Sequence, residues 1–506
     1  MRLLRWKKQH KWFGLLFGGF LLIFCLSGII LNHRTAVSGI DVSRKWLPSS
    51  YRFTNWNLGL VRGTLKAQIG EKTVVLLYGD AGIWLTDSLA SSFTAFNDGL
   101  PQGAAFKSIR NIVQTKKGSL FCAGTFGLYQ YDFAKQQWEA TELKMKEERL
   151  ADLTIRNDTL IVVGRSYLYI SSAPYHQFEL VQLQAPQGYD GKVSLFRTVW
   201  LLHSGELFGA FGKLIMDGIA LLLIILWLTG LLYWFLPKQL RRAKRRGQKS
   251  LISRRLFKSS FSWHDKSGRW TIVLTLLVAT TGWCLRPPLL IPLFLTKTSP
   301  IPGTILDVSN AWEDRLRMLR FDKQHREWIL STSEGFFTLS SLESIPIQQI
   351  DAPPVSVMGI NVLSDDTHGN WLVGSFSGLY IWNRRNNQIR DFYTQETPRP
   401  GNGSPFGQYA IAGYSTDFIK EAYVFDYQTG SNFVPMPDFF ATLPMSLWKL
   451  CVEVHTGRIY TFLGPVTVLF IFLAGLCTIW LLITGYKIRR NKKYLIMNGN
   501  LRKIRG

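Results

Sequence analysis

The chain has 506 residues, a formal net charge of +25 and 47% hydrophobic residues, which allows two or three domains and suits neither a purely soluble protein nor a membrane bundle alone. Its Lys and Arg residues gather in three clusters, at residues 1–11, 238–258 and 487–505. The middle cluster holds ten Lys or Arg and no acid. Because each cluster adjoins an apolar run, the charge indicates cytoplasmic loops of a membrane protein and argues against nucleic-acid binding.

Four apolar runs, at 12–31, 214–236, 270–295 and 462–486, have the length needed to cross about 30 Å of hydrocarbon. The first run is longer than the core of a signal peptide and has no Ala-x-Ala cleavage site, so we interpret it as a retained helix. The third run contains Arg286, Pro287 and Pro288, which predict that its regular helix ends near Cys284. The sequence therefore predicts a four-helix transmembrane bundle.

The basic clusters fix the predicted orientation, with both termini in the cytoplasm and two large domains outside it. The predicted domain boundaries follow from this topology. They are a basic N-terminus at 1–11, helices at 12–32, 204–237, 264–296 and 456–486, β-domains at 33–203 and 297–455, a basic loop at 238–263 and a basic tail at 487–506.

The chain is also an internal duplication of a helix, an outer domain and a second helix. His10 and His264 each begin the pattern His-x3-Gly-x12-[Ser/Thr]-Gly. His203 and His455 each begin His-[Ser/Thr]-Gly-x-[Leu/Ile]-[Phe/Tyr]-x3-Gly, and Thr-Gly recurs at Thr229 and at Thr484. Matched landmarks in the same order make coincidence a poor explanation.

The outer domains repeat on a shorter scale, because 118–132 resembles 369–383, and weaker copies occur at 74–87, 159–171, 328–339 and 409–427. Each copy has an apolar strand, a turn and a second strand, and the turns recur roughly every 40–45 residues, the spacing of propeller blades. The predicted turn positions are Gly79, Gly124, Gly164, Ser333, Gly374 and Gly413. Three blades per half could close into one six-bladed ring, with two separate propeller-like, all-β domains as the alternative.

Five of the eight histidines lie at helix ends, namely His10, His264, His33, His203 and His455, and the other three, His176, His325 and His368, are interpreted as ordinary surface residues of the β-domains. The duplication makes His10 equivalent to His264, and His203 equivalent to His455. A two-fold arrangement would bring each pair face to face, which is what bis-histidine haem ligation requires. His33 has no repeat partner, because Pro287 occupies the matching position, and it is an alternative ligand or a proton or substrate contact.

The glycines near these histidines, among them Gly14, Gly18, Gly19, Gly28, Gly268 and Gly282, either flank a porphyrin or let membrane helices pack closely. Asp217 lies about one turn inside the second helix. It is either a proton or substrate contact or a structural carboxylate paired with Lys213. No zinc-ligand cluster, phosphate loop or nucleotide fingerprint is present, and a disulfide between Cys122 and Cys451 stays open.

Taken together, the segment from Lys8 to Gly14, the Ser27-Gly28 and Thr229-Gly230 dipeptides, Asp217 and the histidines His203 and His455 resemble the PepSY-associated transmembrane helix family. The resemblance covers all four helices and implies two b-type haems held by His10, His264, His203, His455 and in one alternative His33. It also implies reduction of ferric siderophores at the bacterial inner membrane, with the large domains in the periplasm. No PepSY module is evident outside the membrane, where propeller-like repeats take its place.

Two functions follow from these observations. In the first, the chain is a haem-dependent oxidoreductase that carries electrons from membrane quinol or a separate donor protein to a periplasmic ferric chelate such as a ferric siderophore. In the second, it is a non-catalytic sensor or scaffold whose outer propeller binds a ligand or a partner protein. A permease component is a weaker third interpretation, because the helices lack a broken segment or a charged pathway beyond Asp217.

Overall fold

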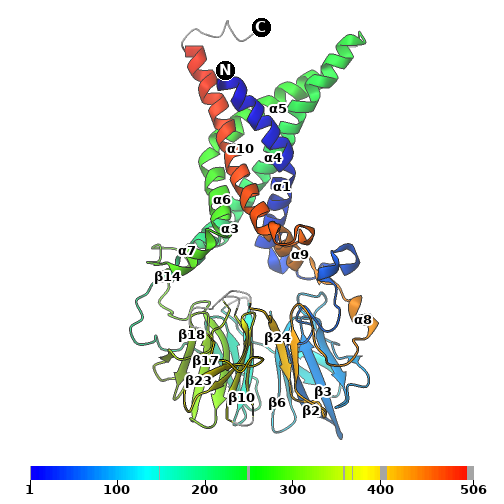
Figure 1. Cartoon of the computed structure of the whole chain (residues 1–506), viewed down its shortest axis with the longest axis vertical. Coiled ribbons are helices and arrows are strands. Elements are labelled where there is room, and N and C mark those ends of the chain that lie inside the picture. Colours follow the sequence, from blue (N-terminus) through cyan, green and yellow to red (C-terminus); the bar gives the residue numbers. More distant parts are fainter. Residues whose placement is uncertain are drawn as a thin grey trace. The chain divides into compact units, whose positions relative to one another are not determined.

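A computed structural model describes residues 2–146, 149–247, 251–356, 359–366, 369–398 and 407–497. These residues form two compact units, both visible in Figure 1. The helical unit comprises residues 1–37, 191–307 and 448–506, and the β unit comprises 38–190 and 308–447. Both halves of the duplication contribute to each unit, so the two predicted β-domains form one unit rather than two.

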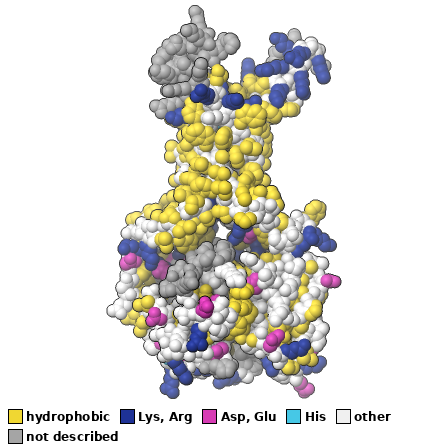
Figure 2. All heavy atoms as spheres, in the orientation of Figure 1, with side chains coloured by type: hydrophobic (Ala, Val, Ile, Leu, Met, Phe, Trp, Pro, Cys, Tyr) yellow, Lys and Arg dark blue, Asp and Glu magenta, His cyan; other side chains and the backbone are white. Residues whose placement is uncertain are grey.

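Three helices of the helical unit are long and apolar enough to cross a membrane, over Leu3–Asn32, Glu206–Arg245 and Val466–Ile488. They belong to α1 (Arg2–Asn32), α4 (Gly209–Arg245) and α10 (Val466–Met497), and α1 packs against both of the others. Figure 2 shows hydrophobic side chains over the middle of these helices, with Lys and Arg side chains near the end where α1 begins. Large exposed residues such as Leu16 and Leu214 suit contact with lipid tails.

The third predicted span is divided into α5 (Leu251–Trp270), α6 (Ile272–Cys284) and α7 (Leu290–Leu295). The regular helix ends at Cys284, as predicted, because two prolines follow within four residues. The segment 264–296 also contains a break between α5 and α6, near residue 271, which was not predicted. Of its pieces, α6 is the apolar one, and with 13 residues it is too short to span by itself.

The basic segment predicted as a loop at 238–263 is largely helical. Helix α4 continues to Arg245, and α5 begins at Leu251. Lys, Arg and Leu are good helix formers, and the rings of Tyr233 and Phe257 stack at 5.5 Å to hold α4 and α5 together. Helix propensity and this stacking together extend the helices beyond the apolar run.

Two short helices fall where the sequence predicted β-domains, α3 (Leu195–Ser204) and α9 (Leu447–Thr456). Each ends before a glycine in the left-handed region, Gly205 with φ 81° and Gly457 with φ 77°. They were missed because ten-residue amphipathic segments resemble strands in the sequence. The helical unit also contains α2 (Arg34–Val37) and the paired short strands β14 (Val193–Ser194) and β15 (Lys297–Thr298).

The β unit consists mainly of antiparallel sheets whose strands follow one another in chain order. Five sheets have four strands, and a sixth has two. They are β2 (Gly63–Ile69), β3 (Lys72–Gly79), β4 (Gly82–Thr86) and β5 (Thr94–Ala95); β6 (Ile109–Gln114), β7 (Leu120–Gly124), β8 (Leu128–Asp132) and β9 (Gln137–Ala140); β10 (Leu150–Arg156), β11 (Thr159–Gly164), β12 (Leu168–Ser172) and β13 (Glu179–Val181); β16 (Leu316–Asp322), β17 (Glu327–Thr332), β18 (Gly335–Leu339) and β19 (Ile347–Gln349); β20 (Ile360–Asp365), β21 (Trp371–Ser375), β22 (Gly378–Asn383) and β23 (Gln388–Asp391); and β24 (Ile411–Ser415) and β25 (Tyr423–Asp426).

The first strand of each sheet contacts the first strand of the next, in the order β2, β6, β10, β16, β20 and β24, and β24 contacts β2. Apolar side chains from neighbouring sheets fill the spaces between them, with Trp138, Trp312 and Trp382 nearly inaccessible to solvent. A short pair outside this series, β1 (Asp41–Val42) with β26 (Met445–Ser446), joins the start of the unit to its end, and α8 (Asp438–Ala441) precedes β26.

Three hairpins of the β unit have the same type of turn. Asp132, Asp322 and Asn383 each accept hydrogen bonds from the backbone N–H groups two and three residues ahead. The fourth residue after each is left-handed, with φ between 53° and 55° at Gln136, Arg326 and Asn387. An Asx side chain that replaces the missing backbone acceptor explains why these turns recur in both halves.

Two of the predicted turns are wrong. Gly374 lies within β21 and Gly413 within β24, whereas the β24–β25 connection is at 416–422. A Cβ at Gly413 would lie 2.4 Å from the carbonyl oxygen of Val61, so this glycine permits close backbone approach. Cys122 and Cys451 are both buried free thiols. Burial raises the pKa of the Cys122 thiol well above its ordinary value.

Candidate functional site

The histidines equivalent by duplication face each other in the helical unit. The rings of His10 on α1 and His264 on α5 have centroids 6.0 Å apart. Those of His203, near the end of α3, and His455, near the end of α9, are 6.1 Å apart. The pairing that the duplication suggested is therefore present, with the two ring planes of each pair inclined at 67° and 46°.

The two pairs lie toward opposite ends of α1. His10 is in the third turn of that helix, whereas His455 is held against Ser27. Seventeen residues separate these two positions on α1, which corresponds to about 26 Å along the helix. The His264 and Thr281 positions have the same separation along α5 and α6.

Each of the four imidazole rings is held by the same two kinds of acceptor, a backbone carbonyl oxygen and a side-chain hydroxyl. The Nδ1 atoms lie 2.9 to 3.2 Å from a backbone carbonyl oxygen, which belongs to Leu481 for His10, Leu226 for His264, Val278 for His203 and Phe24 for His455. Each Nδ1 also lies 3.0 to 3.2 Å from a hydroxyl, on Thr484, Thr229, Thr281 and Ser27 in the same order.

These contacts determine which ring nitrogen carries the proton. A carbonyl oxygen accepts only, so Nδ1 must donate. Each hydroxyl donates to a carbonyl of its own helix, as Ser27 does to Ile23 at 2.7 Å, which leaves its lone pairs for the imidazole. In the neutral ring the lone pair is then on Nε2, the arrangement found in metal-binding histidines.

A glycine follows each hydroxyl residue and lies against the ring that the hydroxyl holds. A Cβ on Gly282 would come within 2.7 Å of the His203 ring, and one on Gly485 within 3.0 Å of His10. Gly28 against His455 and Gly230 against His264 give 3.3 Å each. Each [Ser/Thr]-Gly dipeptide of the repeat thus holds an imidazole, with the hydroxyl accepting from Nδ1 and the glycine leaving room for the ring. We call such a dipeptide a seat.

All four seats connect one half of the duplication to the other. Ser27-Gly28 of the first half holds His455 of the second, and Thr484-Gly485 of the second half holds His10 of the first. The same exchange joins Thr229-Gly230 to His264 and Thr281-Gly282 to His203. Neither half could build either pair alone, which explains why the motifs recur at matched spacing.

Of the remaining glycines of the sequence prediction, Gly14, Gly18 and Gly268 pack against side chains. Cβ atoms on Gly14 and Gly268 would each lie 3.5 Å from a leucine methyl, of Leu481 and Leu226 respectively, the residues whose carbonyls hold the first histidine pair. Gly18 lies against the Trp227 indole. Gly19 has no heavy atom within 4 Å of the Cβ position, so it makes no such contact.

His33 and Asp217 form a separate pair. His33 Nε2 lies 2.8 Å from an Asp217 carboxylate oxygen, and Asn32 donates to the other oxygen at 3.1 Å. Of the two alternatives left open for Asp217, pairing with Lys213 is not the one seen here, because Lys213 lies 3.5 Å from Glu206. Asp217 is 12% exposed and His33 48% exposed, so the pair has one partner accessible from outside the bundle.

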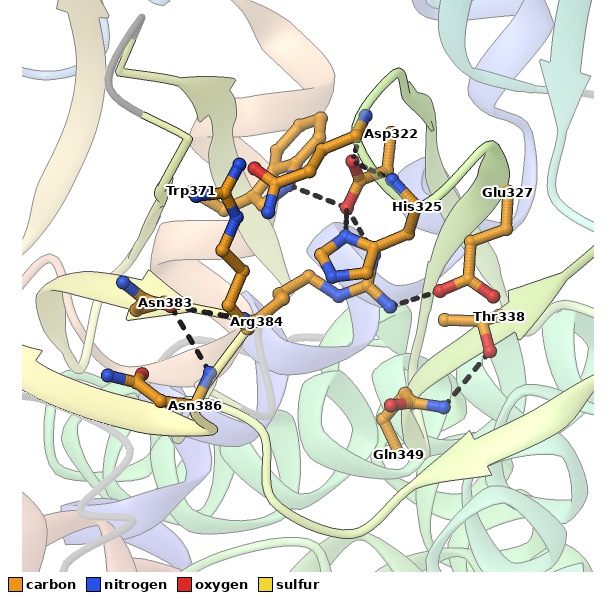
Figure 3. Close-up of polar contacts among 11 residues, drawn as sticks. Asp322, His325, Glu327, Thr338, Gln349, Trp371, Asn383, Arg384 and Asn386 are labelled. Carbon is orange, nitrogen blue, oxygen red and sulfur yellow. Dashed lines mark hydrogen bonds and ion pairs between the residues drawn. The ribbon is translucent and has the colours of Figure 1, made fainter.

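Figure 3 shows a compact cluster of charged side chains in the β unit. Asp322 accepts from His325 at 2.8 Å and from the Trp371 indole at 3.3 Å, and Arg384 bridges Asp322 and Glu327. Burial alone would raise the pKa of Asp322, but hydrogen bonds from His325 and the Arg384 charge hold it below its ordinary value. Because each charge has a partner, the cluster is best explained as a clamp between two sheets.

The other histidines of the β unit add no site. His325 belongs to the clamp, with 29% of its side chain exposed, and His176 is exposed. His368 lies outside the described residues. Within the described part of the chain, no group of three or more His, Cys, Asp or Glu residues could hold a metal ion. The two histidine pairs are therefore the candidate site.

Solved structures similar to the chain include the extracellular domains of two hybrid two-component systems from B. thetaiotaomicron, with 11% and 8% identity and a TM-score of 0.34 each. The matches cover 75% and 76% of this chain and 39% and 40% of those chains. PorZ, a surface component of the type-IX secretion system of Porphyromonas gingivalis, matches with 10% identity, a TM-score of 0.29 and coverage of 76% and 39%. The chain thus spans about two fifths of the length of these structures.

No curated protein sequence matches the chain. The sequence profile of the PepSY-associated TM region matches residues 135–492, which include three of the four facing histidines. This match extends over more than half of the chain and contains two of its three candidate membrane spans. The chain belongs to the PepSY-associated TM family of membrane proteins.

Proposed function

We propose that this chain is a b-type haem protein of the bacterial inner membrane that passes electrons across the bilayer and reduces a ferric chelate, such as a ferric siderophore, on the outer side. The observation that carries the proposal is the pair of facing imidazoles at each end of the bundle. In each pair both Nδ1 atoms are occupied by carbonyl and hydroxyl groups, so both Nε2 lone pairs are free to bind iron.

The geometry of the pairs fits an iron between two imidazoles. A metal–imidazole bond is about 2 Å long, so two opposed ligands place their ring centroids on the order of 6 Å apart. The centroids are 6.0 and 6.1 Å apart here. His10 with His264 would hold one haem b, and His203 with His455 a second. Bis-imidazole haem supplies one-electron transfer without an open coordination position.

The proposed topology has four spans, with α5 and α6 acting together as the fourth. Backbone hydrogen bonds continue across their junction, from Thr271 N–H to Ser267 and from Thr275 N–H to Thr271. Basic residues at the start of α1 and between α4 and α5 favour cytoplasmic termini. The β unit then belongs to the periplasm. Its residues follow α1 and precede α4 in the sequence of the first half, and follow the third span and precede α10 in the second half.

In the β unit we propose a single six-bladed propeller. The contact of each first strand with the next, and of β24 with β2, supports a closed arrangement without free inner edges. Such a domain would present loops to a bulky periplasmic substrate or a partner protein. The last blade has two described strands, β24 and β25.

His33 and Asp217 are assigned to proton or substrate contact rather than to iron. Their hydrogen bond uses His33 Nε2, the ring nitrogen that would bind iron in the two histidine pairs. We propose that the electrons come from membrane quinol or from a separate donor protein.

The test uses purified protein in sealed liposomes with a quinol pool and an internal reductant, and a ferric siderophore outside. A trap for ferrous iron reports reduction. We expect the wild-type chain to reduce external ferric chelate and His10→Ala and His455→Ala to lose this activity. Equal rates with wild-type protein, the variants and empty liposomes would contradict the proposal and favour the sensor or scaffold function.

A further inference from the structure

Arg286 lies beside the His203–His455 pair. It follows α6 by two residues, and its backbone N–H donates to the carbonyl of Trp283 at 3.2 Å, which turns the chain at the helix end. Its guanidinium Nη2 donates to the backbone carbonyl of His455 at 3.1 Å. The charge acts electrostatically on both His203 and His455. A permanent positive charge therefore belongs to this pair's surroundings.

The charge of Arg286 has no counter-ion among the described residues. Arginine has five N–H donors in a planar fork suited to carboxylates, and the one hydrogen bond to His455 uses a single donor. The nearby Arg458 adds repulsion and forms its own ion pair with Glu453 at 2.7 Å. Half-burying a cation without a neighbouring anion costs free energy. The site beside Arg286 would therefore be stabilised by an anionic ligand.

A different charge acts on the His10–His264 pair. The residue after His264 is Asp265, whose negative charge acts on His264. The two pairs have the same seats, but the charge of Asp265 acts on His264 and that of Arg286 acts on His203 and His455. Positive charge stabilises the reduced, less positive form of an iron centre, and negative charge stabilises the oxidised form.

We propose that Arg286 is a positioning residue that binds a carboxylate of the porphyrin held by His203 and His455 and raises the reduction potential of that haem above that of the haem held by His10 and His264. The inference rests on the proposed function. It gives electron flow a direction, from the His10–His264 end toward the His203–His455 end. The positive charge of Arg286 does not depend on electron flow. Its effect on the reduction potential of the haem can therefore be measured without a substrate.

The test is an optical redox titration of the purified two-haem protein. The His10→Ala and His455→Ala variants, each retaining one haem, assign the two waves. We expect the wave that persists in His10→Ala to have the higher potential. A higher potential for the wave that persists in His455→Ala would overturn the proposal directly, even if no Arg286 variant folds.

Substitution of Arg286 itself separates charge from packing. Arg286→Gln should lower the potential of the higher wave alone, whereas Arg286→Lys, which keeps the charge, should stay near the wild-type value. Asp265→Asn is the matched control and should raise the lower wave alone. Equal shifts in Arg286→Gln and Arg286→Lys, or no shift in either, would refute the role of the charge. A wild-type protein without haem would refute the proposed function instead.

Discussion

The helical unit and the β unit both come from the same duplication, yet they retain it in different ways. In the helical unit the repeat is kept residue by residue, because a histidine from one half must fit a hydroxyl and a glycine from the other. In the β unit the halves share turn chemistry and strand order, while the charged contacts differ, as at Asp322. Under the proposed function, the chemistry belongs to the helical unit, and the β unit, in which the charged contacts vary, serves recognition.

The most severe test of this comparison removes one imidazole. His264→Ala should abolish one of two cofactor sites and leave the His203–His455 site intact, because the pairs share no seat. Haem content per chain, by pyridine haemochrome assay, should fall by about one half. His176→Ala, which changes an exposed histidine of the β unit, is the control and should leave the content unchanged.

A smaller change tests the glycine seat. Gly282→Ala places a Cβ 2.7 Å from the His203 ring, so the ring must move and the pair should bind its cofactor more weakly. Gly19→Ala is matched to it, because nothing lies within 4 Å of that position and alanine favours helix. Haem retention during detergent dialysis should fall only in Gly282→Ala. Equal retention in the two variants would show that the glycine is not a seat.

The clamp in the β unit should respond to acid. The pKa of Asp322 is lower in the folded than in the unfolded chain, so its stabilisation is present above about pH 4 and is lost as the pH falls through the folded value. Asp322→Asn should open the 316–332 hairpin at neutral pH, measured by hydrogen exchange of the full chain, with a penalty of a few kcal/mol. The difference from wild type should shrink toward pH 3, and a visible spectrum that changes with Asp322→Asn would contradict the separation of the units.

The smallest expected effect concerns one hydroxyl. Thr281→Val removes an acceptor 3.2 Å from His203 Nδ1, and the carbonyl of Val278 stays in place. A hydrogen bond of this kind contributes about 1 kcal/mol, so thermal loss of haem should occur a few degrees earlier. The exposed neighbour Thr280, changed to valine, should leave this transition where it is in the wild type.

The sequence predicted the histidine pairing because equivalent positions in a duplication meet across a two-fold arrangement. It did not predict the seats, although Ser27-Gly28, Thr229-Gly230, Thr281-Gly282 and Thr484-Gly485 were visible as repeats, because partners 35 to 474 residues apart carry no local signal. Helices α3 and α9 were missed for lack of length, and the basic segment was misread because charge suggested a loop where helix propensity decided.

In the sequence, Arg286 stood out only because it precedes two prolines at a predicted helix end. The role proposed for it depends on its hydrogen bond to the His455 carbonyl, which only the structure reveals. The wrong turn at Gly413 has the opposite origin, because glycine serves close backbone approach as well as turns. Local patterns thus predicted elements, and long-range contacts decided what several residues do.

The central claim, that each facing histidine pair binds a haem, is tested most directly by a dithionite-reduced minus oxidised spectrum of the purified chain, with haem and protein quantified in one sample. We expect a b-type spectrum and about two haems per chain, falling to about one when either His10 or His455 is changed to alanine. A colourless protein after expression with ample iron and haem precursor, or a haem content unaffected by both substitutions, would contradict it.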